Sequence, residues 1–269
     1  QPTPRPSFPS VSLIVPVHKG GTNFETCLQH IALSSVAPDE LIVVADGEPH
    51  STELLAREFN ARVIAIPGPS GPARARNIGA QAARSDVLLF IDADVAIAEN
   101  TVAHVKRVFK EHPEYDAIIG SYDDEPEDPN FLSQYKNLTH HLVHQHSREN
   151  ASTFWGGCGA VKRDVMLQLG GFDESYARPC IEDIELGYRL RAAGKKIHLE
   201  KSLQVKHLKK WTVTSLLRSD IRDRAIPWSE LILNRRLLLD DLNTSRRNRA
   251  SVALLGTSMT LLGLTAWKP

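Results

Sequence analysis

The first 90 or so residues alternate between short apolar runs and segments with helical spacing. The apolar runs cover residues 11–17, 40–45, 62–66 and 87–91. The segments between them, at residues 23–33, 52–59 and 73–83, have apolar residues three and four positions apart or are rich in alanine. Continuous apolar runs of this length are typical of strands buried on both faces of a parallel sheet. The pattern predicts an α/β layer with right-handed crossovers, in which ligands lie beyond the carboxyl ends of the strands.

The middle of the chain continues with more helices and fewer strands. Helical patterns cover residues 100–112, 131–146, 163–169 and 182–193, and apolar runs predict strands at 116–121 and 196–199. Residues 122–129 are acidic and contain two prolines, which favours a loop, and residues 156–161 form a tight, glycine-rich segment. The predicted fold class is therefore α/β, with a mostly parallel central sheet flanked by helices.

A tail of different character follows, and we expect residues 211–269 to be helical and amphipathic. Its last stretch, residues 250–267, contains no charged residue and follows the basic cluster Arg246, Arg247 and Arg249. A stretch of this length is marginal against the ~20 residues that span a bilayer. The basic cluster before it is typical of a protein whose main domain lies on the cytosolic side. We expect a membrane-associated tail, and a terminal helix docked on the domain is the alternative.

Composition narrows the choice of partners. The 32 basic and 32 acidic side chains give no net charge, which argues against a nucleic-acid partner. Residues 1–200 hold 19 basic and 27 acidic residues, a net of −8, whereas residues 201–269 hold 13 and 5, a net of +8. Three scattered cysteines favour reduced thiols in the cytosol over a disulfide framework. The proline-rich residues 1–10 lack the apolar core of a signal peptide and predict a disordered leader.

Carboxylates directly follow two of the apolar runs. Asp92 and Asp94 lie at a predicted strand end, where they can converge on a divalent cation such as Mn²⁺ or Mg²⁺ that is shared with substrate phosphates. A solvated acidic turn is the alternative, but the position at a strand end favours a site. Asp46 follows the second run and could accept hydrogen bonds from a base or a ribose, or could begin a turn with Gly47.

Two further segments could contribute to such a site. Glu182 and Asp183 open a predicted helix, where acidic residues usually serve as caps. A carboxylate held there could also act as a general base if an acceptor hydroxyl lies within reach. Gly157 and Cys158 belong to the glycine-rich segment, whose backbone N–H groups could contact a phosphate or a sugar, with a tight turn as the alternative.

Histidines and arginines add candidates. His140 and His144 share a helical face, and without an HExxH pattern we expect them to line an acceptor site rather than bind zinc. His207 follows a short strand pattern and could complete a metal site. Arg74 and Arg76 lie in a segment without the P-loop signature, yet they could neutralise a diphosphate.

Six segments, taken in order, resemble family 2 glycosyltransferases of the GT-A fold. They are VSLIVPVHKGG, ELIVVADGEPHST, GPARARNIGAQAARSDVLLFIDADV, FWGGCGAVKRDVMLQLGGFDE, IEDIELGYRLRAAGKKI and VKH, and they span residues 11 to about 207. The resemblance implies a catalytic domain at residues 11–210. Its Rossmann-like, nucleotide-sugar-binding half would cover residues 11–120, and its acceptor half residues 121–210.

The resemblance also implies roles for individual residues. Asp46 would bind the nucleotide base, Asp92 the ribose, and Asp94 the Mn²⁺ or Mg²⁺ that bridges the donor diphosphate. Asp183 would be the base that deprotonates the acceptor, so that direct displacement inverts the anomeric carbon. His207 matches a position that ligates metal in related enzymes. Other implied donor-side positions are Pro16, Arg76, Gly157 and Cys158, and implied acceptor-side positions are Glu182, His144 and Trp155.

The substrates are less specified. A UDP-sugar is the preferred donor, with a GDP-sugar possible, and the acceptor would be a hydroxyl or phosphate on a lipid or lipid-linked molecule. Residues 222–228 lack the Gln-x-x-Arg-Trp motif of processive members, which argues against polymer synthesis. The tail resembles membrane-attached bacterial members, which implies the cytoplasmic face of the bacterial inner membrane. A sugar nucleotidylyltransferase is an alternative, although VPVHKGGTN lacks the arginine-containing glycine-rich loop of that class. Another alternative is a nucleotide-sugar-binding protein that has lost catalysis. The presence of all four aspartates, Asp46, Asp92, Asp94 and Asp183, argues against it.

Overall fold

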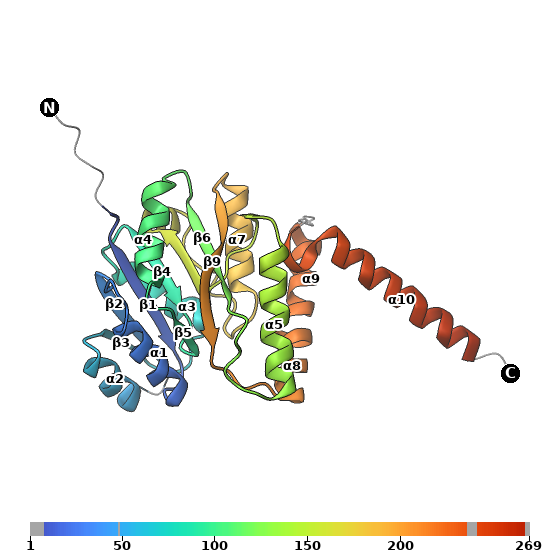
Figure 1. Cartoon of the computed structure of the whole chain (residues 1–269), viewed down its shortest axis with the longest axis horizontal. Helices are drawn as coiled ribbons and strands as arrows, with labels where there is room; N and C mark the ends of the chain where they lie inside the picture. The colour runs from blue at the N-terminus through green and yellow to red at the C-terminus, as the bar shows by residue number, and fades with distance from the viewer. Residues whose placement is uncertain (1–7, 48, 236–240, 267–269) are drawn as a thin grey trace.

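The computed structural model of the chain describes residues 8–47, 49–235 and 241–266. It contains a central nine-stranded sheet with helices on both faces, and a C-terminal helix that projects away from it (Figure 1). The strand order is β3-β2-β1-β4-β8-β6-β9-β5, and β7 pairs with β9 at the side of this path. The expected α/β fold, with a C-terminal helical tail, is confirmed.

The first half of the sheet is parallel, as the apolar runs predict. Its strands are β1 (Val11–Val17), β2 (Glu40–Asp46), β3 (Arg62–Ile66) and β4 (Val87–Ile91). The pairs β1–β2, β1–β4 and β2–β3 are all parallel. The connecting helices are α1 (Thr22–Ala32), α2 (Pro49–Glu58) and α3 (Pro72–Ala82). The carboxyl ends of β1, β2 and β4 therefore meet at one edge of the sheet.

The second half of the sheet is mixed rather than parallel. Its strands are β5 (Val95–Ile97), β6 (Ala117–Tyr122), β7 (Asn150–Ala151), β8 (Cys158–Lys162) and β9 (Ile197–His207). β8 runs antiparallel to both β4 and β6, whereas β6 and β9 are parallel. The glycine-rich segment is thus a strand for most of its length. A Cβ on Gly159 would lie 2.3 Å from the Trp155 carbonyl oxygen, so close backbone packing requires glycine there.

The remaining helices of the sheet domain are α4 (Thr101–Glu111), α5 (Phe131–His146), α6 (Arg163–Gln168) and α7 (Glu182–Ala192). Each was expected from the sequence to within one or two residues at most boundaries. Asn130 lies directly before α5 and caps it, because its side chain accepts a hydrogen bond from the backbone N–H of Ser133. α7 carries Glu182, Asp183 and Glu185 in its first turn, which suits the positive end of the helix dipole.

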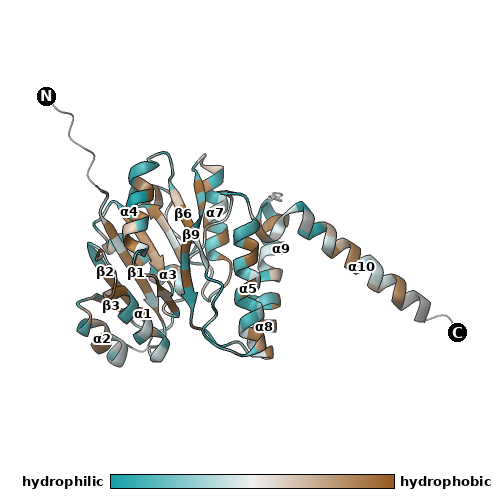
Figure 2. Cartoon of the chain, viewed as in Figure 1, coloured by the Kyte–Doolittle hydropathy of each residue, from teal (hydrophilic) through white to brown (hydrophobic). Residues whose placement is uncertain are grey.

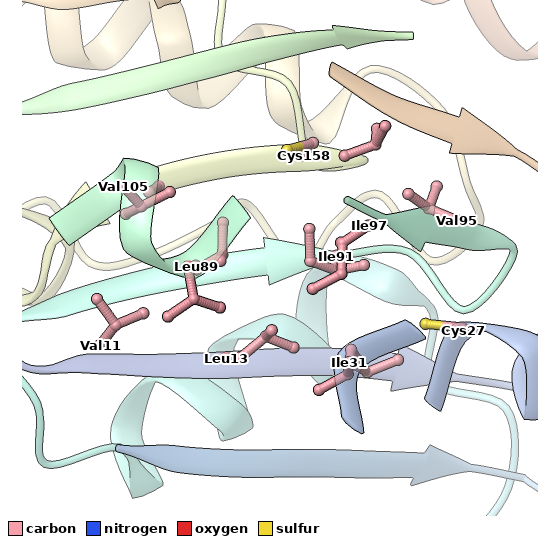
Figure 3. Packing of buried hydrophobic residues seen from close by; sticks show 14 of the residues in the cluster. Val11, Leu13, Cys27, Ile31, Leu89, Ile91, Val95, Ile97, Val105 and Cys158 are labelled. Atoms are coloured by element: carbon pink, nitrogen blue, oxygen red, sulfur yellow. The ribbon is translucent and has the colours of Figure 1, made fainter. Parts of the chain in front are cut away.

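Two apolar clusters cover the two faces of the sheet, because neighbouring residues of a strand point to opposite sides. On one face Leu13 and Leu89 pack with Cys27 and Ile31 of α1 (Figure 3). On the other face Phe90 lies edge-on to Phe154 and Phe172, with ring centroids 6.3 and 5.3 Å apart. Packing of both clusters against the buried strands β1 and β4 holds the ends of these strands in place.

The C-terminal segment consists of α8 (Val213–Leu217), the π-helix η1 (Arg218–Ala225), α9 (Ile226–Arg235), the short η2 (Leu242–Thr244) and α10 (Arg246–Ala266). α9 packs on the domain through Leu231, which is buried against Tyr188 of α7. α10 stands away from the domain, and its apolar side chains, such as Leu254 and Leu255, are exposed (Figure 2). Among the residues that the structure describes, no helix has both the length and the apolar content needed to cross a bilayer.

At the other end of the chain, residues 1–7 of the expected leader lie outside the described residues. Ser10, at the end of that leader, donates hydrogen bonds from both its backbone N–H and its hydroxyl to Asp86. These bonds tie Ser10 to the loop before β4.

Candidate active site

The candidate site lies at the sheet edge where β2 and β4 end. Asp46 is the last residue of β2, and Asp92 and Asp94 directly follow β4. Hydrogen bonds from the Val95 N–H to the Asp92 carbonyl and from the Leu208 N–H to the Asp94 carbonyl fix this turn. The second of these bonds ties the Asp-x-Asp turn to the end of β9.

Asp46 organises the turn that leads into α3. Its buried carboxylate accepts hydrogen bonds from the backbone N–H groups of Ser70 (2.7 Å) and Gly71 (2.8 Å), one on each oxygen. Gly71 has φ 90°, a conformation that favours glycine. The Asp46 carbonyl lies 2.7 Å from His18 Nδ1. Each carboxylate oxygen keeps a further acceptor position, so binding of a base by Asp46 stays a prediction.

Arg76 joins the two halves of the site. Its Nη2 donates to Asp92 (2.7 Å) and its Nη1 to Glu182 (2.8 Å), and the whole side chain is buried. The guanidinium also lies 5.3 Å from the centre of the Phe172 ring. Although burial lowers the pKa of Arg76, the charges of Asp92 and Glu182 raise it overall, so this residue stays cationic. In this structure the Arg76 guanidinium is engaged by Asp92 and Glu182. Its expected contact with a diphosphate stays a prediction.

Asp92 and Asp94 have pKa values shifted in opposite directions. Burial raises the pKa of the Asp92 carboxyl; Arg76 opposes this shift and the charge of Asp94 adds to it. Burial would raise the pKa of Asp94 as well, but the hydrogen bond and charge of His207 bring it below its ordinary value. Asp94 is consequently the carboxylate that stays ionised most readily, which suits a metal ligand.

His207 and Asp94 form a pair suited to a divalent cation. His207 Nε2 lies 3.5 Å from Asp94 Oδ2, and its Nδ1 lies 2.8 Å from Asn137 Oδ1. With Asn137 Oδ1 as the acceptor, His207 Nδ1 carries a proton and donates it. Nε2 is then the ring nitrogen that faces Asp94, and a partner on Nδ1 that fixes the ring is typical of a metal-ligating histidine. Tyr122 stacks on the His207 ring, with centroids 4.5 Å apart, and fixes its plane.

No group of three or more His, Cys, Asp or Glu residues that could hold a metal occurs in the described part of the chain. A two-residue set still fits Mn²⁺ or Mg²⁺ in a phosphate-binding site. Such cations take few protein ligands there and complete their coordination with substrate phosphates and water. The oxygen of Asp94 and the imidazole nitrogen of His207 fit Mn²⁺ well, because it accepts both ligand types.

Asp183 faces the site from the first turn of α7. Its Oδ2 accepts a hydrogen bond from the Gly156 N–H at 3.1 Å. Burial and the neighbouring Glu182 raise the pKa of Asp183 to about 6, although Arg76 opposes them. A carboxylate with a pKa near the working pH can accept a proton and release it again, which a general base requires. A Cβ on Gly156 would lie 2.9 Å from the Arg76 guanidinium, so this close approach depends on glycine.

A wall of aromatic and imidazole rings, formed by Tyr122, Trp155, His140 and His144, adjoins His207. The Trp155 ring lies 4.9 Å from Tyr122, 4.7 Å from His140 and 5.5 Å from His144, measured between ring centroids. Burial lowers the pKa of His144 to about 4 and that of His140 well below its ordinary value. Both imidazoles are therefore neutral near pH 7. His140 Nδ1 is buried and has no hydrogen-bond partner among the described residues.

Some expected site residues lie elsewhere. Glu182 is buried, with one oxygen on Arg76 and the other accepting from the Cys180 N–H at 2.9 Å, so it faces the protein rather than an acceptor. The Cys158 side chain points into the core below the sheet, where burial raises its pKa to about 12 (Figure 3). Gly157 lies directly before β8, and its carbonyl accepts from the Asp92 N–H at 3.4 Å. Pro16 is paired with Val44 within the sheet.

Sequence reasoning missed Tyr122 and Asn137, which position His207 from β6 and α5. Tyr122 is the last residue of β6, so the rule that sites follow strand ends could have identified it. Asn137 gives no such signal, because only the packing of α5 against the end of β9 brings it to His207.

Comparison with known proteins gives relatives of this chain. Residues 12–170, more than half of the chain, match the family model described as Glycosyl transferase family 2. Pre-mycofactocin glycosyltransferase of Mycobacterium tuberculosis is 24% identical over 217 residues, covering 77% of this chain and 44% of that protein. Glycosyltransferase GlyG of Streptococcus pneumoniae is 27% identical over 117 residues, covering 42% of this chain and 38% of that protein. The chain thus spans less than half the length of these two relatives.

Solved structures share the fold. The mannosyltransferase PcManGT from Pyrobaculum calidifontis, in complex with GDP-Man and Mn²⁺, has a TM-score of 0.61 at 20% identity, covering 98% of this chain and 82% of that chain. S. aureus TarS 1–349 has a TM-score of 0.58 at 16% identity, covering 74% of this chain and 60% of that chain. At such identities the likeness concerns the fold, and it confirms the expected GT-A architecture.

Proposed function

Because the chain belongs to glycosyl transferase family 2, we propose that it transfers a sugar from a nucleotide-diphosphate sugar, preferably UDP-linked, with inversion at the anomeric carbon. Family membership makes the protein a glycosyltransferase. The inverting course, the nucleotide and the residue roles are the parts that we add. One observation carries the proposal: Arg76 links Asp92, on the donor side, to Glu182, which adjoins Asp183 on the acceptor side.

The proposed reaction is a single displacement. Asp183 accepts the proton of the acceptor hydroxyl, whose oxygen forms a bond to the anomeric carbon as the bond from that carbon to the diphosphate breaks. The electron pair of the broken bond leaves with the nucleoside diphosphate. The raised pKa of Asp183, about 6, leaves it mostly ionised at pH 7 and able to take up the proton. During the displacement, the contacts of Arg76 hold Asp92 and Glu182 in place. They thereby keep the donor and the base, Asp183, correctly positioned relative to each other.

Asp94 and His207 would hold the divalent cation, and a cation there neutralises negative charge on the departing diphosphate. Asn137 and Tyr122 keep the His207 ring oriented toward Asp94. The neutral wall of Trp155, His140 and His144 excludes water from one side of the acceptor.

A lipid or lipid-linked acceptor at the cytoplasmic face of a bacterial inner membrane completes the proposal. Its support is the C-terminal segment, where a net charge of +8 over residues 201–269 accompanies the exposed apolar side chains of α10. Basic residues near an anionic leaflet contribute about 1 kcal/mol each, and apolar side chains on the same segment add to the attraction.

Donor binding and turnover test the catalytic part. Thermal shift with UDP- and GDP-sugars in the presence of Mn²⁺ identifies the donor, since a ligand that binds only the folded state raises the Tm. Slow hydrolysis of that donor by the wild type, lost in Asp183→Asn without weaker UDP binding, is the expected result. Equal hydrolysis by both proteins would refute the assignment of Asp183 as the base. Release of pyrophosphate from UTP and a sugar 1-phosphate would instead indicate a nucleotidylyltransferase.

Vesicle co-sedimentation tests the membrane part. The full chain is expected to sediment with vesicles that contain phosphatidylglycerol, and much less with phosphatidylcholine vesicles or at high salt. A matched form ending at residue 245 keeps the sheet domain and removes α10. Equal sedimentation of both forms, or none with anionic vesicles, would contradict a membrane role for this helix.

A further inference from the structure

A continuous helical segment crosses the acceptor half of the domain. It runs through α8, η1 and α9, and its middle eight residues, Arg218–Ala225, are π-helical. π-Helical stretches are rare and frequently occur at functional sites. We call residues 213–235 the strap. Figure 1 shows α8 and α9 beside α5 at the edge of the sheet domain.

The strap is fastened on both sides of the site. On one side Asp220 forms an ion pair with Lys136 of α5. On the other side Trp228 Nε1 donates to the Tyr188 hydroxyl of α7 at 3.1 Å. A further ion pair, at 3.5 Å, joins Asp223 to Arg178 in the loop before α7. The strap therefore spans the gap between α5, which carries the histidine wall, and α7, which carries Asp183.

Arg224 lies midway between these two anchors. Residues 220, 224 and 228 are four apart, so they fall on one side of a helix with about 3.6 to 4.4 residues per turn. Asp220 and Trp228 both contact the domain, so Arg224, whose side chain is exposed, leaves the strap on the same side, between these two anchors. The outer side of the strap carries Val213, Leu217 and Ile221, all at least half exposed at 61%, 51% and 53%.

Electrostatic effects on the site agree with this direction. Burial and Glu182 raise the pKa of Asp183, whereas Arg76 and, more weakly, Arg224 lower it. Burial and His144 lower the pKa of His140, and Arg224 lowers it further. Arg224 is thus close enough to Asp183 of α7 and to His140 of α5 for its charge to shift their pKa values.

Arg224 is also a cation without a counter-ion. Arg76 is paired with two carboxylates. Asp220 and Asp223 of the strap each form an ion pair with a basic side chain, Lys136 and Arg178 respectively. Arg224 makes no ion pair with the described residues, although its charge acts on Asp183 and on His140. A guanidinium in such a position is suited to bidentate binding of a phosphate group.

We propose that Arg224 binds a phosphate group of a substrate while the strap lies over the site. This inference rests on the proposed function, which supplies phosphate from two sources: the diphosphate of the donor, or a phosphate on a lipid-linked acceptor. Either source places the negative charge of a phosphate group between Asp183 and the two histidines His140 and His144. The positive charge of Arg224 would balance it there.

Isothermal titration on the full chain tests this proposal with two probes in parallel. The first probe is UDP with Mn²⁺, and the second is citronellyl phosphate, a short polyprenyl phosphate analogue, added with UDP and Mn²⁺ present. Arg224→Gln is expected to weaken one of them about 10- to 100-fold, because hydrogen bonds to charged groups carry this much affinity. Loss of UDP affinity identifies the donor diphosphate as the partner, and loss of citronellyl phosphate affinity identifies an acceptor phosphate.

Arg222→Gln is the matched control, since Arg222 lies on the same π-helix and is exposed like Arg224, but is two positions away from the side that carries Asp220 and Trp228. It is expected to bind both probes like the wild type. Arg224→Lys retains the charge without the bidentate geometry, and it should recover part of the affinity; it also serves if Arg224→Gln does not fold. Wild-type affinity for both probes in both Arg224 variants, or no phosphate binding by the wild type, overturns the inference. If Asp183→Asn abolishes donor hydrolysis while the Arg224 variants bind normally, the proposed function stands and this inference alone fails.

Discussion

Replacing Asp183 by asparagine should stop sugar transfer and at the same time stabilise the fold at neutral pH. The Asp183 carboxyl has its pKa raised from 3.8 to about 6, chiefly by burial. Between these two values the folded protein holds a proton that the unfolded chain has already released. The stability of the wild type therefore falls as the pH rises through this window, and above pH 6 the full cost of holding a buried carboxylate is present.

The size of the effect follows from that pKa shift. Two pKa units correspond to about 3 kcal/mol, and because solvent partly reaches Asp183 this is an upper limit. Asparagine has the same shape, accepts the hydrogen bond from the Gly156 N–H and never ionises. Asp183→Asn should therefore raise the free energy of unfolding at pH 8 by about 1–3 kcal/mol, which is a few degrees in Tm for a chain of this size.

Two assays on the same pair of proteins check both parts. Unfolding by urea at pH 8 and at pH 4.5 should show the full gain in stability at pH 8 and only about a third of it at pH 4.5. Wild-type turnover should fall about tenfold from its plateau when the pH reaches 5, because about one tenth of Asp183 is then ionised. A less stable Asp183→Asn at pH 8, or turnover that is flat between pH 5 and 8, would refute the reasoning.

Two other contacts make predictions of the same kind. Glu182→Gln leaves the buried Arg76 with Asp92 as its only paired carboxylate, so we expect a loss of about 3–5 kcal/mol in the free energy of unfolding, measured in urea; unchanged stability would show that Glu182 does not hold Arg76. Asn137→Leu removes the acceptor for His207 Nδ1, so Mn²⁺ binding in the presence of UDP should weaken about 10- to 100-fold by titration calorimetry, while an exposed control such as Gln29→Leu keeps the wild-type affinity.

The parallel half of the fold could be predicted because each of its strands is a continuous apolar run followed by a helix-spaced segment. The same regularity identified Asp46, Asp92 and Asp94, since all three follow such runs. The antiparallel strand β8 could not be predicted this way. Its sequence, CGAVK, is short and contains Gly159, which favours a turn in the sequence but serves close packing against Trp155 in the structure.

The site was predicted less completely than the fold, because many of its contacts join elements far apart in sequence. From the sequence, Glu182 is interpreted as a helix cap or an acceptor-side residue. In the structure its carboxylate accepts a hydrogen bond from Arg76, which lies 106 positions earlier in the chain. Asn137 has ordinary sequence surroundings, and only the placement of α5 beside the end of β9 gives it a role. Sequence reasoning gave no sign of the π-helical form of η1, and the contacts of Asp220 and Trp228 beside it join elements far apart in sequence.

The position of the metal tests the central claim most directly. A crystal of the protein grown with UDP and Mn²⁺ and measured near the manganese absorption edge gives an anomalous signal at the metal alone. The account predicts one strong peak within about 2.3 Å of an Asp94 oxygen and His207 Nε2, with the diphosphate of UDP completing its coordination. Manganese bound away from Asp94 and His207, or UDP bound with no metal beside its diphosphate, would contradict it.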